Sequence, residues 1–303
     1  MSNDAAQLCF ENTGYCSCCR TETTFAALKP WLRDNYICRN CWSIPRQRHL
    51  QYVLDTRFPG WEHRTVHESS PSHDFIERFA HDYTSSQYFP GIPPGSEHNG
   101  SRCENVESLT FADESIDIFI TQDVLEHVFD PAAAVREIHR VLRPGGAHVF
   151  TAPKHKGLLE TIQRARINQD GEVEHLMEES YHGNPVGDGK ALVTFDYGYD
   201  FELLMSDWSG ATVEAVHTRD RGLGLDAEFN EVFVIRKAPP VVAGALRPTG
   251  GEADSSQLER RRLVDRLRPW STLPSRIRQK IARGVRSRAH RPGQLKPAAD
   301  RVG

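Results

Sequence analysis

In the middle of the chain, a hydrophobic pattern typical of a strand is followed by one typical of a helix. Residues 116–121 form a short β-branched and aromatic run between acidic turn residues, typical of a strand buried on both faces of a parallel sheet. Asp130-Pro131 then supplies an N-cap and a first helical proline, and apolar residues follow at helical spacing. Arg143-Pro144-Gly145-Gly146 ends this helix, and residues 147–151 return as a strand. The unit predicts a right-handed crossover in a parallel sheet, with ligands beyond the carboxyl ends of its strands.

The segments on either side extend this α/β pattern. They predict strands at residues 64–68 and 83–89, with a helix at residues 75–80 between them. A breaker-rich loop at residues 90–100 takes the place of a second helix, and residues 211–217 and 231–236 form a closing antiparallel hairpin. We therefore expect an α/β domain that ends near Ala238, where a linker rich in Ala, Gly and Pro begins.

The central block resembles the core of S-adenosylmethionine-dependent class I methyltransferases of the type 11-like kind. Five pieces match in family order: Asn105, Leu109-Thr110-Phe111, Ile116-Asp117-Ile118-Phe119, Leu125-Glu126-His127-Val128 and Arg140-Val141-Leu142-Arg143-Pro144-Gly145-Gly146. The resemblance implies a Rossmann-like sheet of seven strands with helices on both faces, over residues 56–238. It also implies transfer of a methyl group from the sulfonium of S-adenosylmethionine to an oxygen or nitrogen acceptor.

The resemblance places the cofactor contacts at the ends of the first four strands. They are Glu68, Ser69, Ser70, Pro71, Ser86, Asn105, Val106, Thr121 and Gln122. The family usually has a glycine-rich loop after the first strand and an acidic residue after the second. This chain has a turn rich in serine and proline at the first point and the neutral residues Thr84, Ser85, Ser86 and Gln87 at the second. The serine-rich turn either still offers N–H groups and hydroxyls to the cofactor's carboxylate, or has lost the close approach and left a non-catalytic scaffold.

Two residues are candidates for work on the acceptor. Asp123 ends the fourth strand, where family members face both cofactor and acceptor; it either orients or deprotonates a nucleophile, or caps the short helix 124–128. Residues 154–201 form an insertion dense in His, Asp, Asn and aromatic residues, which predicts either an acceptor lid or a surface excursion. Within it, His182 is the first candidate for a general base, because an imidazole near its free pKa accepts a proton at neutral pH.

Four of the seven cysteines have the spacing of a metal site. Cys16-x-x-Cys19 and Cys38-x-x-Cys41, with eighteen residues between the pairs, predict a zinc ribbon over residues 1–55 in which four thiolates close one structural zinc site. Disulfides are the competing interpretation, and Cys18 competes with its neighbours as a ligand. The basic residues Arg46, Arg48 and His49 follow as a solvated helix start or a contact surface for an anionic partner.

Charge divides the chain into two parts. Residues 257–303 hold twelve arginines and two lysines against three acidic residues, a balance of +11. Because the whole chain carries −4, the first 256 residues carry −15. The basic tail after the linker 239–256 suits RNA or an anionic membrane surface, or is a disordered solvated arm.

These features give three functional hypotheses. A small-molecule or saccharide methyltransferase comes first, because the polar-aromatic insertion suits a hydroxyl-rich acceptor and the body is acidic. An RNA methyltransferase that uses ribbon and tail is the alternative, since some ribosomal-RNA methyltransferases carry a similar ribbon; a cofactor-inactive scaffold is the third. The chain shows neither a signal-like start nor a run approaching the roughly 20 apolar residues of a membrane span, so we expect a cytoplasmic protein without a transmembrane segment.

Overall fold

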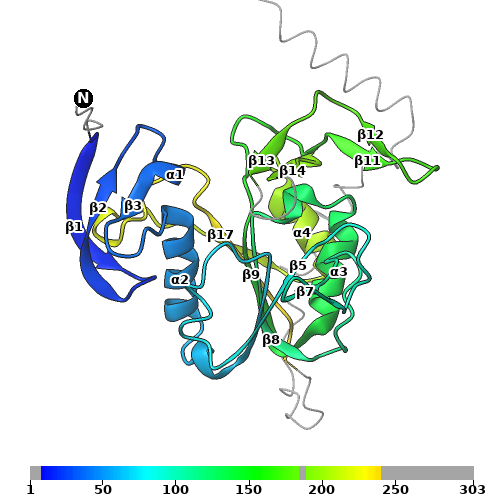
Figure 1. The fold of residues 1–303 in the computed structure, drawn as a ribbon, viewed down its shortest axis with the longest axis horizontal. Helices are drawn as coiled ribbons and strands as arrows, with labels where there is room; N and C mark the ends of the chain where they lie inside the picture. Colours follow the sequence, from blue (N-terminus) through cyan, green and yellow to red (C-terminus); the bar gives the residue numbers. More distant parts are fainter. Residues whose placement is uncertain (1–7, 184–188, 240–303) are drawn as a thin grey trace, which may run out of the picture. The chain divides into compact units, whose positions relative to one another are not determined.

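An eight-stranded mixed sheet forms the centre of the computed structural model, which describes residues 8–183 and 189–239 (Figure 1). Its order is β16-β17-β9-β8-β4-β5-β7-β6. The strands are β4 (Thr65–Ser69), β5 (Asp82–Gln87), β6 (Glu97–His98), β7 (Ser101–Cys103), β8 (Ile116–Gln122), β9 (Leu142–Thr151), β16 (Val213–Val216) and β17 (Val232–Arg236). The short strand β6 pairs antiparallel with β7 and brings the sheet to eight strands rather than the seven expected.

The direction in which the chain adds strands to the sheet reverses between β4 and β8. From β4 the chain moves outward to β5 and β7, then returns to β8 on the other side of β4 and continues to β9. These five strands run parallel, whereas β17 and β16 form the predicted antiparallel closing hairpin. A change of this kind leaves a crevice at the carboxyl ends of the strands, the usual ligand position in open α/β sheets.

Helices cover both faces of the sheet (Figure 1). Helix α2 (Pro45–Arg57) packs Leu50 and Leu54 against one face, and α3 (Pro131–Val141) and α4 (Phe201–Ser209) pack against the other. The start of α3 confirms the predicted cap, because Asp130 Oδ1 accepts a hydrogen bond of 2.8 Å from Ala133 N.

The helix predicted over residues 75–80 is wrong. The segment between β4 and β5 consists of turns and bends. Phe75 packs into the N-terminal core that contains the cysteines, and its neighbour Ile76 packs into the core of the main sheet. The segment therefore joins two cores, and its apolar residues do not lie along one side of a helix.

The N-terminal residues form a three-stranded antiparallel sheet of β1 (Phe10–Cys16), β2 (Thr21–Ala27) and β3 (Tyr36–Cys38), with the short helix α1 (Leu32–Asn35). The expectation of a solvated basic helix start is wrong, because Arg48 and His49 are fully buried. The Arg48 guanidinium donates to the carbonyl oxygens of Tyr36 and Gly224, at 2.8 and 2.7 Å. It thus ties α2 to the N-terminal sheet and to the β16–β17 connection.

The insertion 154–201 is more regular than expected. It contains three two-stranded ladders: β10 (Ile162–Gln163) with β15 (Phe195–Asp196), β11 (Ala165–Ile167) with β12 (Val173–His175), and β13 (Tyr181–Gly183) with β14 (Lys190–Leu192). Two hydroxyls anchor it to the segment around the 3-10 helix η2 (Leu125–His127): Tyr197 Oη donates to Leu125 O at 2.7 Å and Thr194 Oγ1 to Val128 O at 2.5 Å.

The predicted basic tail 257–303 and nearly all of the linker 239–256 lie outside the described residues. Among the residues that are described, none of the helices has the length and apolar character needed to cross a membrane.

Candidate functional site

Three predicted cofactor residues lie side by side at the carboxyl ends of adjacent strands. Ser69 pairs in register with Ser86 on β5 and with Thr121 on β8. The hydroxyls of Ser86 and Thr121 hydrogen-bond His67 and His148, each at 3.0 Å, inside the sheet. Burial lowers the pKa of both imidazoles to about 3, so they are neutral at physiological pH. These two histidines, which sequence reasoning missed, engage the serine and threonine hydroxyls.

Glu68 and Gln122 face each other at the change of direction between β4 and β8. Gln122 Nε2 donates to Glu68 Oε1 at 2.8 Å, and Tyr83 Oη donates to Glu68 Oε2 at 3.0 Å. Burial raises the pKa of Glu68 to about 7, against the opposing effect of these two donors. The structure therefore brings two predicted residues from distant parts of the sequence into one buried polar group.

The turn after β4 departs most from a glycine-rich loop. Ser70 has a φ of +55°, a left-handed conformation that glycine usually adopts. Ser70 N donates to Ser86 O at 2.8 Å, and Gln87 Nε2 donates to Pro71 O at 3.2 Å. The turn has a left-handed residue at Ser70, but turns and bends rather than a helix follow it, so no helix N-terminus stands there.

Asn105 and Val106 lie just beyond β7. Asn105 Oδ1 accepts from Glu107 N at 3.0 Å, which closes a tight turn, and the Val106 side chain is buried in the core. The preceding Glu104, which sequence reasoning did not single out, is buried and accepts from Thr110 N at 3.0 Å. The Glu104 carboxylate therefore stabilises the turn that follows β7.

Asp123 is held by two arginines from the N-terminal part of the chain. Arg33 Nη2 lies 2.5 Å and Arg46 Nε 3.2 Å from its Oδ2, while Thr151 Oγ1 donates to Oδ1 at 2.9 Å. Burial alone would raise the pKa of Asp123, but Arg46 and Arg33 outweigh it and hold the pKa below its ordinary value. Asp123 has a φ of +53° and does not cap the following 3-10 helix. Arg46 was singled out in the sequence as part of a basic group, whereas nothing in the sequence pointed to Arg33.

His182 lies beside Glu126 although 56 positions separate them. His182 Nδ1 is 3.7 Å and His127 Nε2 is 3.8 Å from Glu126 Oε1. Burial raises the pKa of Glu126 well above its ordinary value, and the charge of Asp123 adds to this effect. Burial also lowers the pKa of His182, so its imidazole is neutral at physiological pH. Asp123 lies three positions before Glu126, and His182 lies beside Glu126. The structure thus places the two predicted catalytic residues at the same short segment, residues 123–126.

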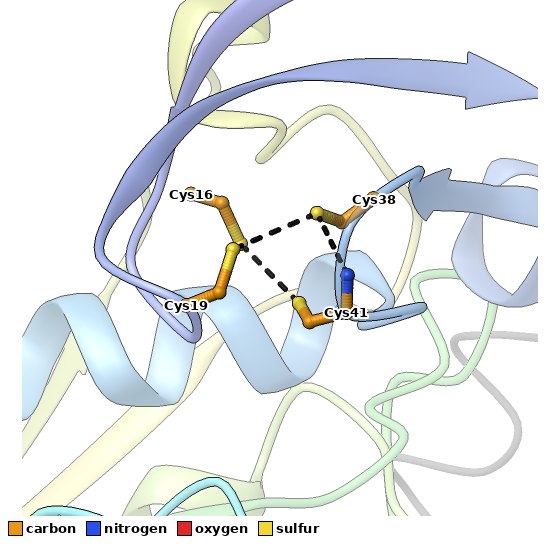
Figure 2. A group of neighbouring side chains, drawn as sticks. All are labelled: Cys16, Cys19, Cys38 and Cys41. Atoms are coloured by element: carbon orange, nitrogen blue, oxygen red, sulfur yellow. Dashed lines mark hydrogen bonds between the residues drawn. The ribbon is translucent and has the colours of Figure 1, made fainter.

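The four predicted cysteine ligands come together in the N-terminal sheet. Figure 2 shows their side chains pointing toward one centre, and the four sulfur atoms lie within 4.8 Å of one another. Cys16 Sγ is 3.7 Å from Cys41 Sγ, and Cys19 Sγ is 3.9 Å from Cys38 Sγ. Tetrahedral zinc with Zn–S bonds of about 2.3 Å requires S···S separations of about 3.8 Å, so the group fits that ion. Cys18 is buried and does not belong to this group.

Comparisons with known proteins find similarity in the part of the chain that forms the central sheet. Residues 61–150, which include β4 to nearly all of β9, match the family model described as "Methyltransferase domain". The chain is 42% identical over 45 residues to the ubiquinone biosynthesis O-methyltransferase of Parvibaculum lavamentivorans, covering 15% of this chain and 18% of that protein. It is 39% identical over 61 residues to the dimethylglycine N-methyltransferase of Parasynechococcus marenigrum, covering 18% and 22%.

The chain spans about a quarter or less of the length of the curated relatives it matches. A solved S-adenosylmethionine-dependent methyltransferase from Mesorhizobium loti aligns with 62% of this chain and 97% of its own, at 16% identity and a TM-score of 0.41. The family match supports, for the matched part of the chain, the α/β methyltransferase class expected from the sequence.

Proposed function

We propose that the chain is an S-adenosylmethionine-dependent methyltransferase acting on an oxygen or nitrogen of a small molecule or saccharide. The observation that carries the proposal is that the matched residues 61–150 coincide with the strands flanking the change of direction between β4 and β8. The crevice where open α/β sheets usually bind ligands therefore lies within the region that matches the methyltransferase family model.

The nine predicted cofactor residues remain the proposed contacts, with roles that the geometry makes more specific. Backbone groups of the turn at Ser69, Ser70 and Pro71 approach the cofactor, since Ser86 and Thr121 have their hydroxyls engaged by histidines. Glu68 and Gln122 form the polar floor between β4 and β8. The turn at Asn105 and Val106 lies against the adenine. When bound, S-adenosylmethionine supplies the electrophilic methyl group, and the chain aligns the acceptor with it.

His182 and Asp123 are the proposed catalytic residues. For a hydroxyl acceptor, His182 takes the proton, because partial desolvation lowers the pKa of its imidazole and leaves a ring nitrogen free to accept. Asp123 is a weak base, since Arg33 and Arg46 hold it ionised; its role is to fix these two cations near the acceptor. The insertion anchored at η2 serves as the lid that excludes water.

A structural zinc in the N-terminal sheet is the second part of the proposal. Four thiolates leave no open coordination position, so this ion stabilises the fold and takes no part in methyl transfer. The sulfur separations of 3.7 and 3.9 Å support it.

Calorimetric titration with S-adenosylhomocysteine, the demethylated cofactor, tests the proposal. We expect micromolar binding that weakens at least about tenfold, or 1.4 kcal/mol, in the Ser70→Trp and Asn105→Ala variants. Asn99→Ala is the matched control, because Asn99 lies before the amino end of β7 in the turn from β6, and it should bind like the wild type. Absence of binding to folded, zinc-containing protein would refute the proposal.

Two alternatives have specific support. A cofactor-inactive scaffold is favoured by the missing helix after β4 and by the ion pair of Arg33 with Asp123 beside the strand ends; measured methyl transfer to any acceptor would exclude it. An RNA methyltransferase is favoured by the charge of residues 257–303. Salt-sensitive RNA binding that disappears on deletion of these residues would support RNA as the acceptor.

A further inference from the structure

Three metal-ligating side chains converge beside the end of β8, apart from the cysteines. Glu126 and His127 come from η2, and His182 comes from β13 of the insertion. One ligand atom of each residue lies within 4.8 Å of the other two. The three residues thus form a cluster of two imidazoles and one carboxylate, called here the Glu-His-His cluster.

Among the residues that the structure describes, none donates a hydrogen bond to the carboxylate at the centre of this cluster. The Glu126 side chain is 0% exposed, and both of its oxygens are buried without a donor in the described residues. The nearest imidazole nitrogens, at 3.7 and 3.8 Å, are too distant for hydrogen bonds. An unpaired buried carboxylate is costly, and native proteins normally provide a partner for such a group. The two carboxylate oxygens of Glu126 are therefore available to a bound ligand.

His127 is oriented as a metal-binding histidine is. His127 Nδ1 lies 2.8 Å from Leu192 O, so this nitrogen carries the proton and donates it to the carbonyl. Its Nε2 is then left with a lone pair on the side of Glu126. A backbone carbonyl that fixes the tautomer in this way is the usual second partner of a metal-binding histidine.

Nearby cations do not neutralise Glu126 directly. The guanidinium groups of Arg33 and Arg46 are paired with Asp123, three positions earlier. The ion pairs of Glu126 within the described chain are restricted to the two histidines of the cluster. His182 is 45% exposed, so the cluster is open to solvent on the side of the insertion.

We propose that Glu126, His127 and His182 bind a divalent transition-metal ion, distinct from the zinc of the cysteine group. Two imidazoles and one carboxylate suit Zn²⁺, Mn²⁺ or Fe²⁺ and leave coordination positions open, in contrast to the closed site of four thiolates. This inference extends the proposed function. An ion held here would bind a hydroxyl acceptor and lower its pKa, so the proton would pass to solvent and His182 would serve as a ligand rather than as the base.

Manganese binding tests the site without requiring methyl transfer. Protein that holds one equivalent of zinc, after a mild chelator has removed weakly bound metal, is titrated with Mn²⁺, and the sharp paramagnetic resonance signal of free Mn²⁺ measures how much is bound. Thiolate sites disfavour this ion, so the cysteine group does not compete. We expect one Mn²⁺ per chain in the wild type and at least about tenfold weaker binding in Glu126→Gln and His182→Gln, as for loss of one ligand group.

His175→Gln is the matched control. His175 lies on β12 of the same insertion and also faces a carboxylate, with its Nε2 3.4 Å from Glu179 Oε1, but it is outside the cluster. Its variant should bind Mn²⁺ like the wild type. Circular dichroism verifies that each variant folds. Because the His182 side chain is exposed, replacing it disturbs the fold less than replacing the buried Glu126.

The proposal is overturned if the wild type binds neither Mn²⁺ nor a second equivalent of Zn²⁺, measured by elemental analysis. It is also overturned if both cluster variants keep their affinity, or if His175→Gln loses as much as they do. The titration with S-adenosylhomocysteine is independent of this result. Cofactor binding without metal binding would reject the metal site alone, and metal binding without cofactor binding would reject the methyltransferase.

Discussion

Glu68 shows how one buried residue links stability to the proposed cofactor site. Its carboxyl group lies between β4 and β8, where it accepts hydrogen bonds from Tyr83 and Gln122. Burial raises its pKa from 4.5 to about 7, so the folded chain holds the proton more tightly than the unfolded chain. The stabilising contribution of the protonated group is therefore present at low pH and is lost as the pH rises through about 7.

Glu68→Gln should remove this pH dependence. The variant should become more stable relative to the wild type by about 2 kcal/mol between about pH 5 and pH 8, because glutamine does not ionise. Urea unfolding at the two pH values measures the difference. Glu172→Gln, at an exposed position of the insertion, should show no such trend. An equal stability difference at both pH values would mean that Glu68 is already ionised at the lower one.

At the scale of elements, the N-terminal sheet depends on its two cysteine turns. Cys16 ends β1 and Cys38 ends β3, and each turn brings a second cysteine back toward the first. A small sheet of three strands has limited apolar burial, so the bound ion contributes folding free energy directly.

Cys38→Ser should release the proposed zinc and destabilise the N-terminal sheet. Structural zinc sites contribute roughly 10 kcal/mol of binding free energy, so we expect a loss of several kcal/mol in unfolding free energy. Cys38 is the informative position, because Cys18 stands near Cys16 and Cys19 in the sequence as a spare thiol. Cys9→Ser is the control, since Cys9 is exposed and outside the group. Elemental analysis that finds as much zinc in purified Cys38→Ser as in the wild type would contradict this assignment.

The elements that the sequence predicted correctly are those with local signals. The cap at Asp130 and the apolar run of β8 need only their neighbours, and both lie where they were expected. The helix over residues 75–80 failed because Phe75 and Ile76 belong to different cores, which only the tertiary fold determines. Arg48 was misjudged for the same reason, since its carbonyl partner Gly224 is 176 positions away.

The candidate site was predictable to the same extent. The strand ends at Glu68 and Gln122 follow from the β-α-β pattern and the resemblance, and the structure joins them. The ion pair of Arg33 with Asp123 and the approach of His182 to Glu126 connect separate segments of the chain. No periodicity or spacing indicates such contacts, so the Glu-His-His cluster needed the three-dimensional structure.

At the scale of the whole described molecule, three parts of the chain meet beside the end of β8. The N-terminal part contributes Arg33 and Arg46, the sheet contributes Asp123, and the insertion contributes His182. A methyltransferase needs a cofactor position, an acceptor position and a cover against water, and these parts can supply all three. We propose that the cofactor binds at the carboxyl ends of β4, β5, β7 and β8.

Hydrogen–deuterium exchange with and without S-adenosylhomocysteine tests that claim most directly, because it reports both binding and position. A bound cofactor should slow amide exchange in the turns that follow the four strands, residues 69–72, 86–88, 105–108 and 121–124, and leave the turn at residues 98–101 unchanged. Unchanged exchange in all four turns at saturating ligand, or protection confined to other segments, would contradict the cofactor site proposed for this chain.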